Sequence, residues 1–112
     1  MFTLSVDAPA AGAARLRLVG HLDEPAARQV LHAAADVVRC GCSRLVVDLA
    51  DVASYDDEAA YAVTGCTRLS RWLPEGVHVV PGAGAGADLA QQAGVEAHDH
   101  HAAGSMASCP AC

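Results

Sequence analysis

A short apolar run at residues 45–47, within RLVVDLADV, constrains the fold more than any other feature of the chain. Continuous apolar runs of this kind are typical of parallel strands that helices cover on both faces. One helical pattern precedes the run in the sequence and another follows it, and a second apolar segment, VHVV, comes after the later helix. Strand-helix-strand order implies parallel pairing with right-handed crossovers. The sequence therefore predicts an α/β fold with residues 45–47 in a central strand.

The amino-terminal segment predicts an antiparallel hairpin. FTLSV and RLRLVGHL both alternate apolar and polar residues, as half-buried strands do. The small residues of APAAGAA between them indicate the turn, and the second strand should span about six residues. This hairpin adds an antiparallel edge to the predicted sheet.

Three helices are expected between and after the later strands. The first begins at Asp23 or Glu24, with Pro25 in its first turn, and stops at Gly41. Its predicted buried face consists of Ala27, Leu31, Ala34 and Val38. The second, which Pro74 and Gly76 end, has a predicted buried face of Ala59, Ala62, Val63, Cys66, Leu69 and Leu73, and Trp72 should pack as well. DLAQQAGV forms a short third helix.

The predicted order is therefore ββαβαβα, a mixed four-stranded sheet with about three helices. With 112 residues, the chain is long enough for one domain and too short for two. We assign the domain to residues 1–97, and a tail without periodic core pattern to residues 98–112.

Charge and hydropathy exclude several classes of function. The net charge is -6, lysine is absent and the arginines are scattered, so no basic stripe is present for nucleic acid or anionic lipid. No apolar run approaches the ~20 residues of a membrane span. The amino terminus resembles no secretory signal. We expect a soluble, cytoplasmic protein without direct nucleic-acid binding or membrane insertion.

The glycine run GAGAGA at 82–87 formally matches the G-x-G-x-x-A fingerprint of dinucleotide-binding turns. That fingerprint belongs to a unit with a further strand and an acidic residue about 20 positions on. The chain ends without that strand. We therefore interpret the run as a flexible turn and expect no cofactor.

Borderline thiolate and imidazole metal ligands gather near the end of the chain, at His98, His100, His101, Cys109 and Cys112. Cys109 and Cys112 form a C-x-x-C pair, which is half of a zinc site, but no second pair of ligands lies at a conventional spacing from it. We therefore predict opportunistic capture of metal and no dedicated site. A metal-responsive protein remains an alternative function. The other three cysteines, at 40, 42 and 66, should be reduced and structural.

Two further side chains have open roles. His21 could form an acid-base couple with Asp23, but no serine or cysteine nucleophile lies in a recognisable activating motif, and a helix cap explains Asp23 more simply. Tyr61 either packs or points outward as an interface contact, and the sequence does not decide between these.

Three consecutive acids, Asp56, Asp57 and Glu58, open the second helix. Carboxylates there cap free amides and meet the positive end of the helix dipole. Capping accounts for one or two acids, whereas three in a row repel one another by a few tenths of a kcal/mol per close pair. The triplet therefore suggests a role beyond capping.

The segments LVGHLDEPAA, RLVVDLADV and YDDEAAYAV together resemble a STAS domain, the family of anti-sigma factor antagonists. The resemblance covers about residues 12–96. Gly20, Leu22, Asp23, Asp48 and Asp56 match the family pattern. It implies the ββαβαβα fold and a non-catalytic protein-interaction module whose partner is an anti-sigma factor of the kinase-like ATPase type.

The family's Asp-Ser-Ser-Gly motif is the point of departure. Its first serine, which the anti-sigma factor kinase phosphorylates, falls on Asp57; the second falls on Glu58 and the glycine on Ala59. A carboxylate cannot serve as this phosphoacceptor, but it carries about half the charge of phosphoserine. The resemblance thus implies a constitutive or charge-locked regulator.

The implied binding surface comprises Asp23, Asp56, Asp57, Glu58 and Tyr61. Family members also occur as small subunits of transporter complexes, which is the alternative at the level of the partner. The sequence leaves open whether the chain forms a homodimer.

Overall fold

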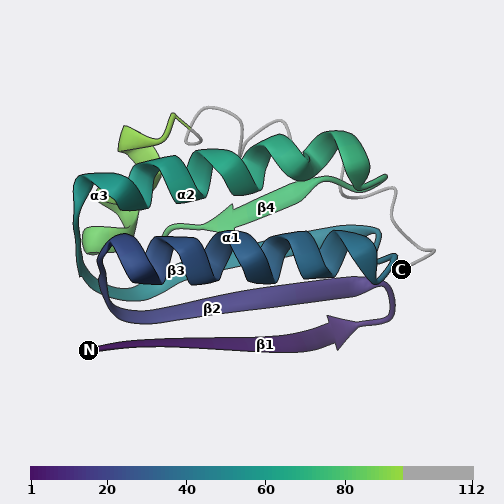
Figure 1. Cartoon of the computed structure of the whole chain (residues 1–112), viewed down its shortest axis with the longest axis horizontal. Helices are drawn as coiled ribbons and strands as arrows, with labels where there is room; N and C mark the ends of the chain where they lie inside the picture. Colours follow the sequence, from purple (N-terminus) through teal and green to yellow (C-terminus); the bar gives the residue numbers. More distant parts are fainter. Residues whose placement is uncertain (95–112) are drawn as a thin grey trace.

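The computed structural model describes residues 1–94, so the predicted tail at 98–112 lies outside the described residues. The elements are β1 (Phe2–Ala10), β2 (Ala13–Leu22), α1 (Glu24–Arg39), β3 (Arg44–Tyr55), α2 (Asp57–Arg68), the 3₁₀ turn η1 (Leu69–Trp72), β4 (Val77–Val80) and α3 (Ala85–Gln92). Figure 1 shows this order, which confirms the predicted ββαβαβα fold. No helix within residues 1–94 is long and apolar enough to cross a bilayer.

The four strands form one mixed sheet in the order β1-β2-β3-β4. β1 is antiparallel to β2, whereas β3 is parallel to both of its neighbours, which confirms its predicted central position. The predicted turn at residues 8–14 was too long, because the strands continue to Ala10 and resume at Ala13, which pair with each other. Gly12, at φ 78°, allows the tight turn, and β2 begins directly after it at Ala13.

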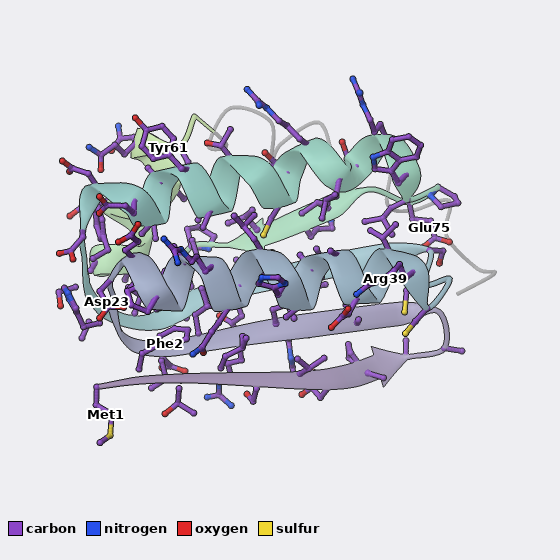
Figure 2. The ribbon with its side chains drawn as sticks, in the orientation of Figure 1. Met1, Phe2, Asp23, Arg39, Tyr61 and Glu75 are labelled. Carbon is purple, nitrogen blue, oxygen red and sulfur yellow. The ribbon has the colours of Figure 1, made fainter. Side chains whose placement is uncertain are left out.

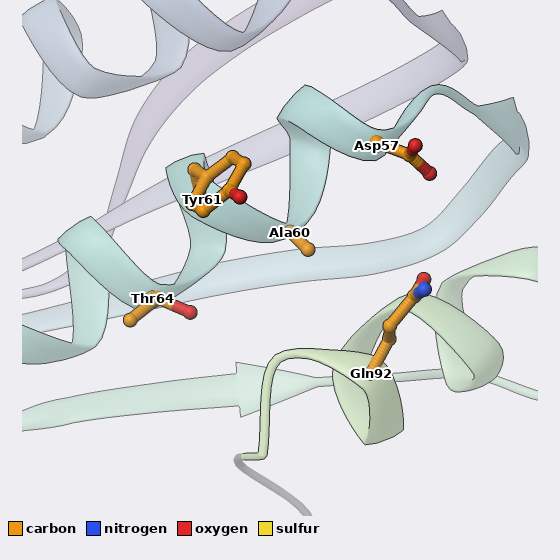
Figure 3. A pocket seen from close by; sticks show the side chains of 5 residues that line it. All are labelled: Asp57, Ala60, Tyr61, Thr64 and Gln92. Carbon is orange, nitrogen blue, oxygen red and sulfur yellow. The ribbon is translucent and has the colours of Figure 1, made fainter.

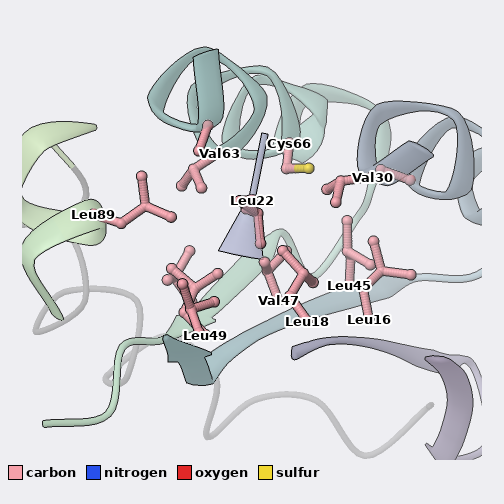
Figure 4. Packing of buried hydrophobic residues seen from close by; sticks show 14 of the residues in the cluster. Leu16, Leu18, Leu22, Val30, Leu45, Val47, Leu49, Val63, Cys66 and Leu89 are labelled. Atoms are coloured by element: carbon pink, nitrogen blue, oxygen red, sulfur yellow. The ribbon is translucent and has the colours of Figure 1, made fainter. Parts of the chain in front are cut away.

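The helices bury one hydrophobic core against one face of the sheet. Alternate residues of β2 and β3 point into it, and α1 and α2 pack over them (Figure 4). α3 closes the core beside the part of β3 that extends beyond β4, and its Leu89 points toward Leu49 and Val63. The largest fully buried side chains are Leu16, Leu18, Leu22, Leu45, Leu49, Leu89, Val30, Val47, Val63 and Cys66.

The opposite face of the sheet carries exposed ion pairs, so the prediction of helices on both faces was wrong. Arg15 binds Asp7 at 2.6 Å and Arg17 binds Asp51 at 2.9 Å. The Arg15 guanidinium also holds the pKa of the Asp7 carboxyl below its ordinary value. Val46, the middle residue of the apolar run, points to this face and is buried there beside its cross-strand neighbour Arg15. Its burial explains why the run is continuously apolar although no helix covers this face.

The buried stripe of α1 differs from the prediction. Val30 and Val37 are buried, while Leu31 is exposed and Val38 is half-buried. Leu31 instead lies against α2, where a Cβ added at Gly65 would sit 2.7 Å from its Cδ2. The stripe is shifted because α1 packs against α2 as well as the sheet.

Trp72, which was expected to pack, is wrongly predicted: 64% of its surface is exposed at the end of η1. Of the other predicted packing residues of this region, Leu69 is half-buried, and the rest are buried: Ala59, Ala62, Val63, Cys66 and Leu73. The 3₁₀ turn explains the difference, because its tighter winding turns Trp72 away from the stripe that α2 presents to the core.

The glycine run has a packing role that its sequence did not indicate. A Cβ at Gly82 would lie 2.6 Å from the Cα of Ala50, and one at Gly86 would lie 2.0 Å from the carbonyl oxygen of Leu49. Only glycine allows the backbone to approach another strand this closely. The run therefore lets α3 dock directly on β3.

Candidate functional site at the amino end of the second helix

The topology places the starts of α1 and α2 side by side. β2 and β3 are parallel, so their carboxyl ends meet, with Leu22 opposite Tyr55. The Asp56 amide donates to the Leu22 carbonyl at 2.9 Å, which links the two strand-to-helix turns. Figure 2 shows Asp23 and Tyr61 at this same end of the molecule. The residues predicted to form one surface are therefore brought to one edge.

Asp23 is a helix cap, as predicted. Its Oδ1 accepts a hydrogen bond from the Ala26 amide at 3.0 Å, and Pro25 occupies the first turn of α1. Half-buried and engaged in this way, the carboxylate stabilises the helix start. Because its carboxylate contacts the helix, Asp23 lies at the edge of the predicted binding surface.

Asp56 occupies the N-cap position of α2, but its side chain makes no capping hydrogen bond. Its Oδ1 instead lies 3.3 Å from Nε2 of His21. The Nδ1 of the same ring lies 2.7 Å from Oγ of Ser54. The preference for Asp23 as a helix cap over a partner of His21 is confirmed, because the Asp23 carboxylate accepts from the Ala26 amide of α1.

Sequence reasoning missed Ser54. It lies 33 residues from His21, on a different strand, and no local motif joins them. The available signal was topological: both residues lie at the carboxyl ends of strands predicted to be parallel neighbours. Such strand ends meet at one edge of a sheet.

Asp57 and Glu58 form the first turn of α2 and are exposed. Their charges face the positive end of the helix dipole, which stabilises them there. Asp56 makes no side-chain cap bond, and Asp57 and Glu58 supply the negative charge of the first turn of α2. The helix start is thus acidic and open to solvent.

An open groove of about 390 Å³ separates α2 from α3 at this end. Figure 3 shows its lining, with Gln92 of α3 pointing across toward α2. The lining residues are Asp57, Ala60, Tyr61, Thr64 and Gln92. The structure also resolves the orientation of Tyr61, which is 76% exposed and points outward.

The described residues hold no group of three or more histidine, cysteine or acidic side chains arranged to bind a metal ion. The candidate ligands His98, His100, His101, Cys109 and Cys112 lie outside the described residues. Among the other cysteines, Cys40 is exposed, Cys42 is half-buried and Cys66 is buried. Desolvation raises the pKa of the Cys66 thiol to about 12, so it is an unreactive core residue.

Comparison with known proteins gives a consistent fold. No protein-family model matches the sequence, and no curated protein matches it. Among solved structures, an anti-sigma factor antagonist from Mycobacterium paratuberculosis is similar, with a TM-score of 0.76, 18% identity, and 96% of each chain covered.

Two structures of SpoIIAA are also similar. The anti-sigma factor antagonist SpoIIAA in its unphosphorylated form has a TM-score of 0.62 and 16% identity, over 80% of this chain and 82% of that one. The Bacillus cell fate determinant SpoIIAA in its phosphorylated form has a TM-score of 0.64 and 15% identity, over 83% of this chain and 85% of that one. These anti-sigma factor antagonists are STAS domains. The chain therefore has the STAS fold that its sequence resemblance predicted.

Proposed function

We propose that the protein is a non-catalytic interaction module of the anti-sigma factor antagonist type, or a degenerate relative, acting in the cytoplasm. One observation supports the proposal: Asp57, on which the family's phosphoacceptor serine falls by the sequence resemblance, is exposed in the first turn of α2 on a STAS fold. The partner is an anti-sigma factor of the kinase-like ATPase type. Any nucleotide would be bound by that partner.

Asp57 supports a switch that is fixed in one state. Phosphoserine carries about -1.5 to -2 charges at neutral pH, so a carboxylate at the same place supplies about half of that charge permanently. In the family, phosphorylation weakens binding to the anti-sigma factor. The chain is then either charge-locked in the weak-binding form or matched to a partner with a basic pocket.

The shape and charge of the region suit protein binding. Tyr61 is exposed one turn after Asp57, and both line the groove between α2 and α3. Exposed tyrosines beside a groove are frequent anchors of interfaces, and surrounding acids steer a basic partner into register. Asp56 and Glu58 extend this acidic rim, and Asp23 borders it.

Replacing Asp57 by serine tests the assignment of the phosphoacceptor position. Asp57→Ser, incubated with a kinase-type anti-sigma factor of the same organism and radiolabelled ATP, should incorporate about one phosphate per chain at position 57. The native chain, which retains Ser54, and Asp57→Ala are the controls and should incorporate none at this position. Absence of label from a variant whose circular dichroism is native would contradict the proposal.

A further inference from the structure

A serine, a histidine and a carboxylate form a continuous chain at the strand ends. Ser54 Oγ lies 2.7 Å from His21 Nδ1, and Asp56 Oδ1 lies 3.3 Å from Nε2 of the same ring. The three residues come from three elements: the end of β2, the end of β3 and the start of α2. Their arrangement is therefore a product of the fold.

The carboxylate selects the form of the imidazole ring. A carboxylate oxygen can only accept, so its proximity to Nε2 stabilises the tautomer that carries its proton there. In the neutral ring, Nδ1 then has a free lone pair directed at the Ser54 hydroxyl, at hydrogen-bond distance. A base oriented by a third group and within reach of a hydroxyl is the arrangement that activates a serine nucleophile.

We propose that Ser54 is a nucleophile that accepts an acyl group from neutral activated esters, with His21 as general base and Asp56 as a positioning residue. Ser54 Oγ attacks the ester carbonyl carbon and forms a new C–O bond, while its proton passes to Nδ1 of His21. The bond from that carbon to the leaving oxygen then breaks, and the leaving group takes the proton from Nδ1. The products are an acylated Ser54 and a free alcohol or phenol.

Charge and access define the class of acyl donor. Asp56, Asp57 and Glu58 surround this end of the molecule with negative charge, which disfavours anionic acyl donors. The side chains of His21 and Asp56 are 39% and 50% exposed, so a small neutral ester can reach them. General-base assistance is typically worth about 10²–10⁴-fold in rate. This acyl transfer requires no anti-sigma factor as partner.

The test is site-resolved acetylation of the full chain. The chain contains no lysine, which removes the commonest competing nucleophile. After its exposed thiols are blocked with iodoacetamide, the chain is incubated with p-nitrophenyl acetate, and acetylation is quantified by peptide mass spectrometry. Ser5 and Ser70, which are also exposed, serve as internal controls.

Acetylation of Ser54 should exceed that of Ser5 and Ser70 by about 100-fold or more, and His21→Gln should abolish the difference. Asp56→Asn should slow acetylation, and imidazole ¹⁵N NMR should show His21 losing its preference for the Nε2-protonated tautomer. The thermal unfolding midpoint of each variant verifies its fold. Equal labelling of the three serines, no effect of His21→Gln in a folded variant, or labelling by nucleoside triphosphate alone would overturn the proposal.

Discussion

Burial fixes the protonation state of one residue and links it to stability. Because a thiolate would lose its hydration in the core, desolvation raises the pKa of Cys66 to about 12. In the unfolded chain the pKa of a thiol is about 8.5. Above that value the unfolded chain releases a proton that the folded chain retains. The free energy of unfolding therefore falls as pH rises, by up to about 1.4 kcal/mol per pH unit.

Urea unfolding at pH 8 and at pH 10.5 measures this residue-scale effect. The native chain should lose about 2.5 kcal/mol more between the two values than Cys66→Ala loses. Cys40→Ala, which removes an exposed thiol, should keep the native slope. An equal loss in Cys66→Ala and the native chain would show that the thiol is not protected by the core.

Among the helices, α1 and α2 each have an aspartate at the N-cap position, but the side chains of these two residues make different contacts. Asp23 caps α1 through its side chain, whereas Asp56 contacts His21 and leaves α2 without such a bond. Asp23→Ala should lower the free energy of unfolding by about 1 kcal/mol. Asp56→Ala should lower it by less than about half of that. Chemical denaturation of both variants tests the contrast, and equal costs would contradict it.

The docking of α3 on β3 makes a second prediction at this scale. Gly86→Ser places a Cβ against the Leu49 carbonyl and should lower the free energy of unfolding by about 3 kcal/mol or more, because neither backbone can move freely. Gly84→Ser is the matched control, since its Cβ would meet nothing within 4 Å and serine suits its N-cap position. Similar unfolding midpoints for the two variants would show that the approach is looser than described.

The elements also show what the sequence could predict. Alternation predicted β1 and β2, and helical spacing with capping signals predicted α1 and α2, because these patterns are local. The predicted start of α3 was wrong, because the helix begins at Ala85, inside the glycine run interpreted as a turn. The apolar run of β3 was misjudged on one point: its second face is occupied by cross-strand arginine neighbours rather than a helix. Similarly, the stripe of α1 depends on contact with Gly65 of α2, which lies far along the chain.

At the scale of the whole molecule, the acidic end was predictable and its internal contacts were not. Asp56, Asp57 and Glu58 are adjacent in the sequence, so a local pattern predicted them at the start of a helix. The pairing of His21 with Ser54 and Asp56 depended on the strand register, and the groove depended on Gln92 arriving from α3. A binding surface assembled from distant segments requires the fold.

Two exposed aromatic residues, Tyr61 in α2 and Trp72 in η1, allow the position of the interface to be tested. Tyr61 lines the groove, whereas Trp72 on η1 is also exposed but lies outside that lining. Tyr61→Ala should weaken binding to an anti-sigma factor by about 30-fold, the value of about 2 kcal/mol expected for an anchor. Trp72→Ala should change it by less than about threefold. The reverse ranking, measured by calorimetry, would move the interface to the other end of α2.

The most direct measurement of the central claim is the affinity of the native chain and of Asp57→Ser for each kinase-type anti-sigma factor of the same organism. Calorimetry with and without ATP gives both values. We expect at least one of the two chains to bind: tight binding by the native chain identifies a constitutive antagonist, and binding by the serine variant alone identifies a charge-locked one. No binding by either folded chain to any of these factors would contradict the account.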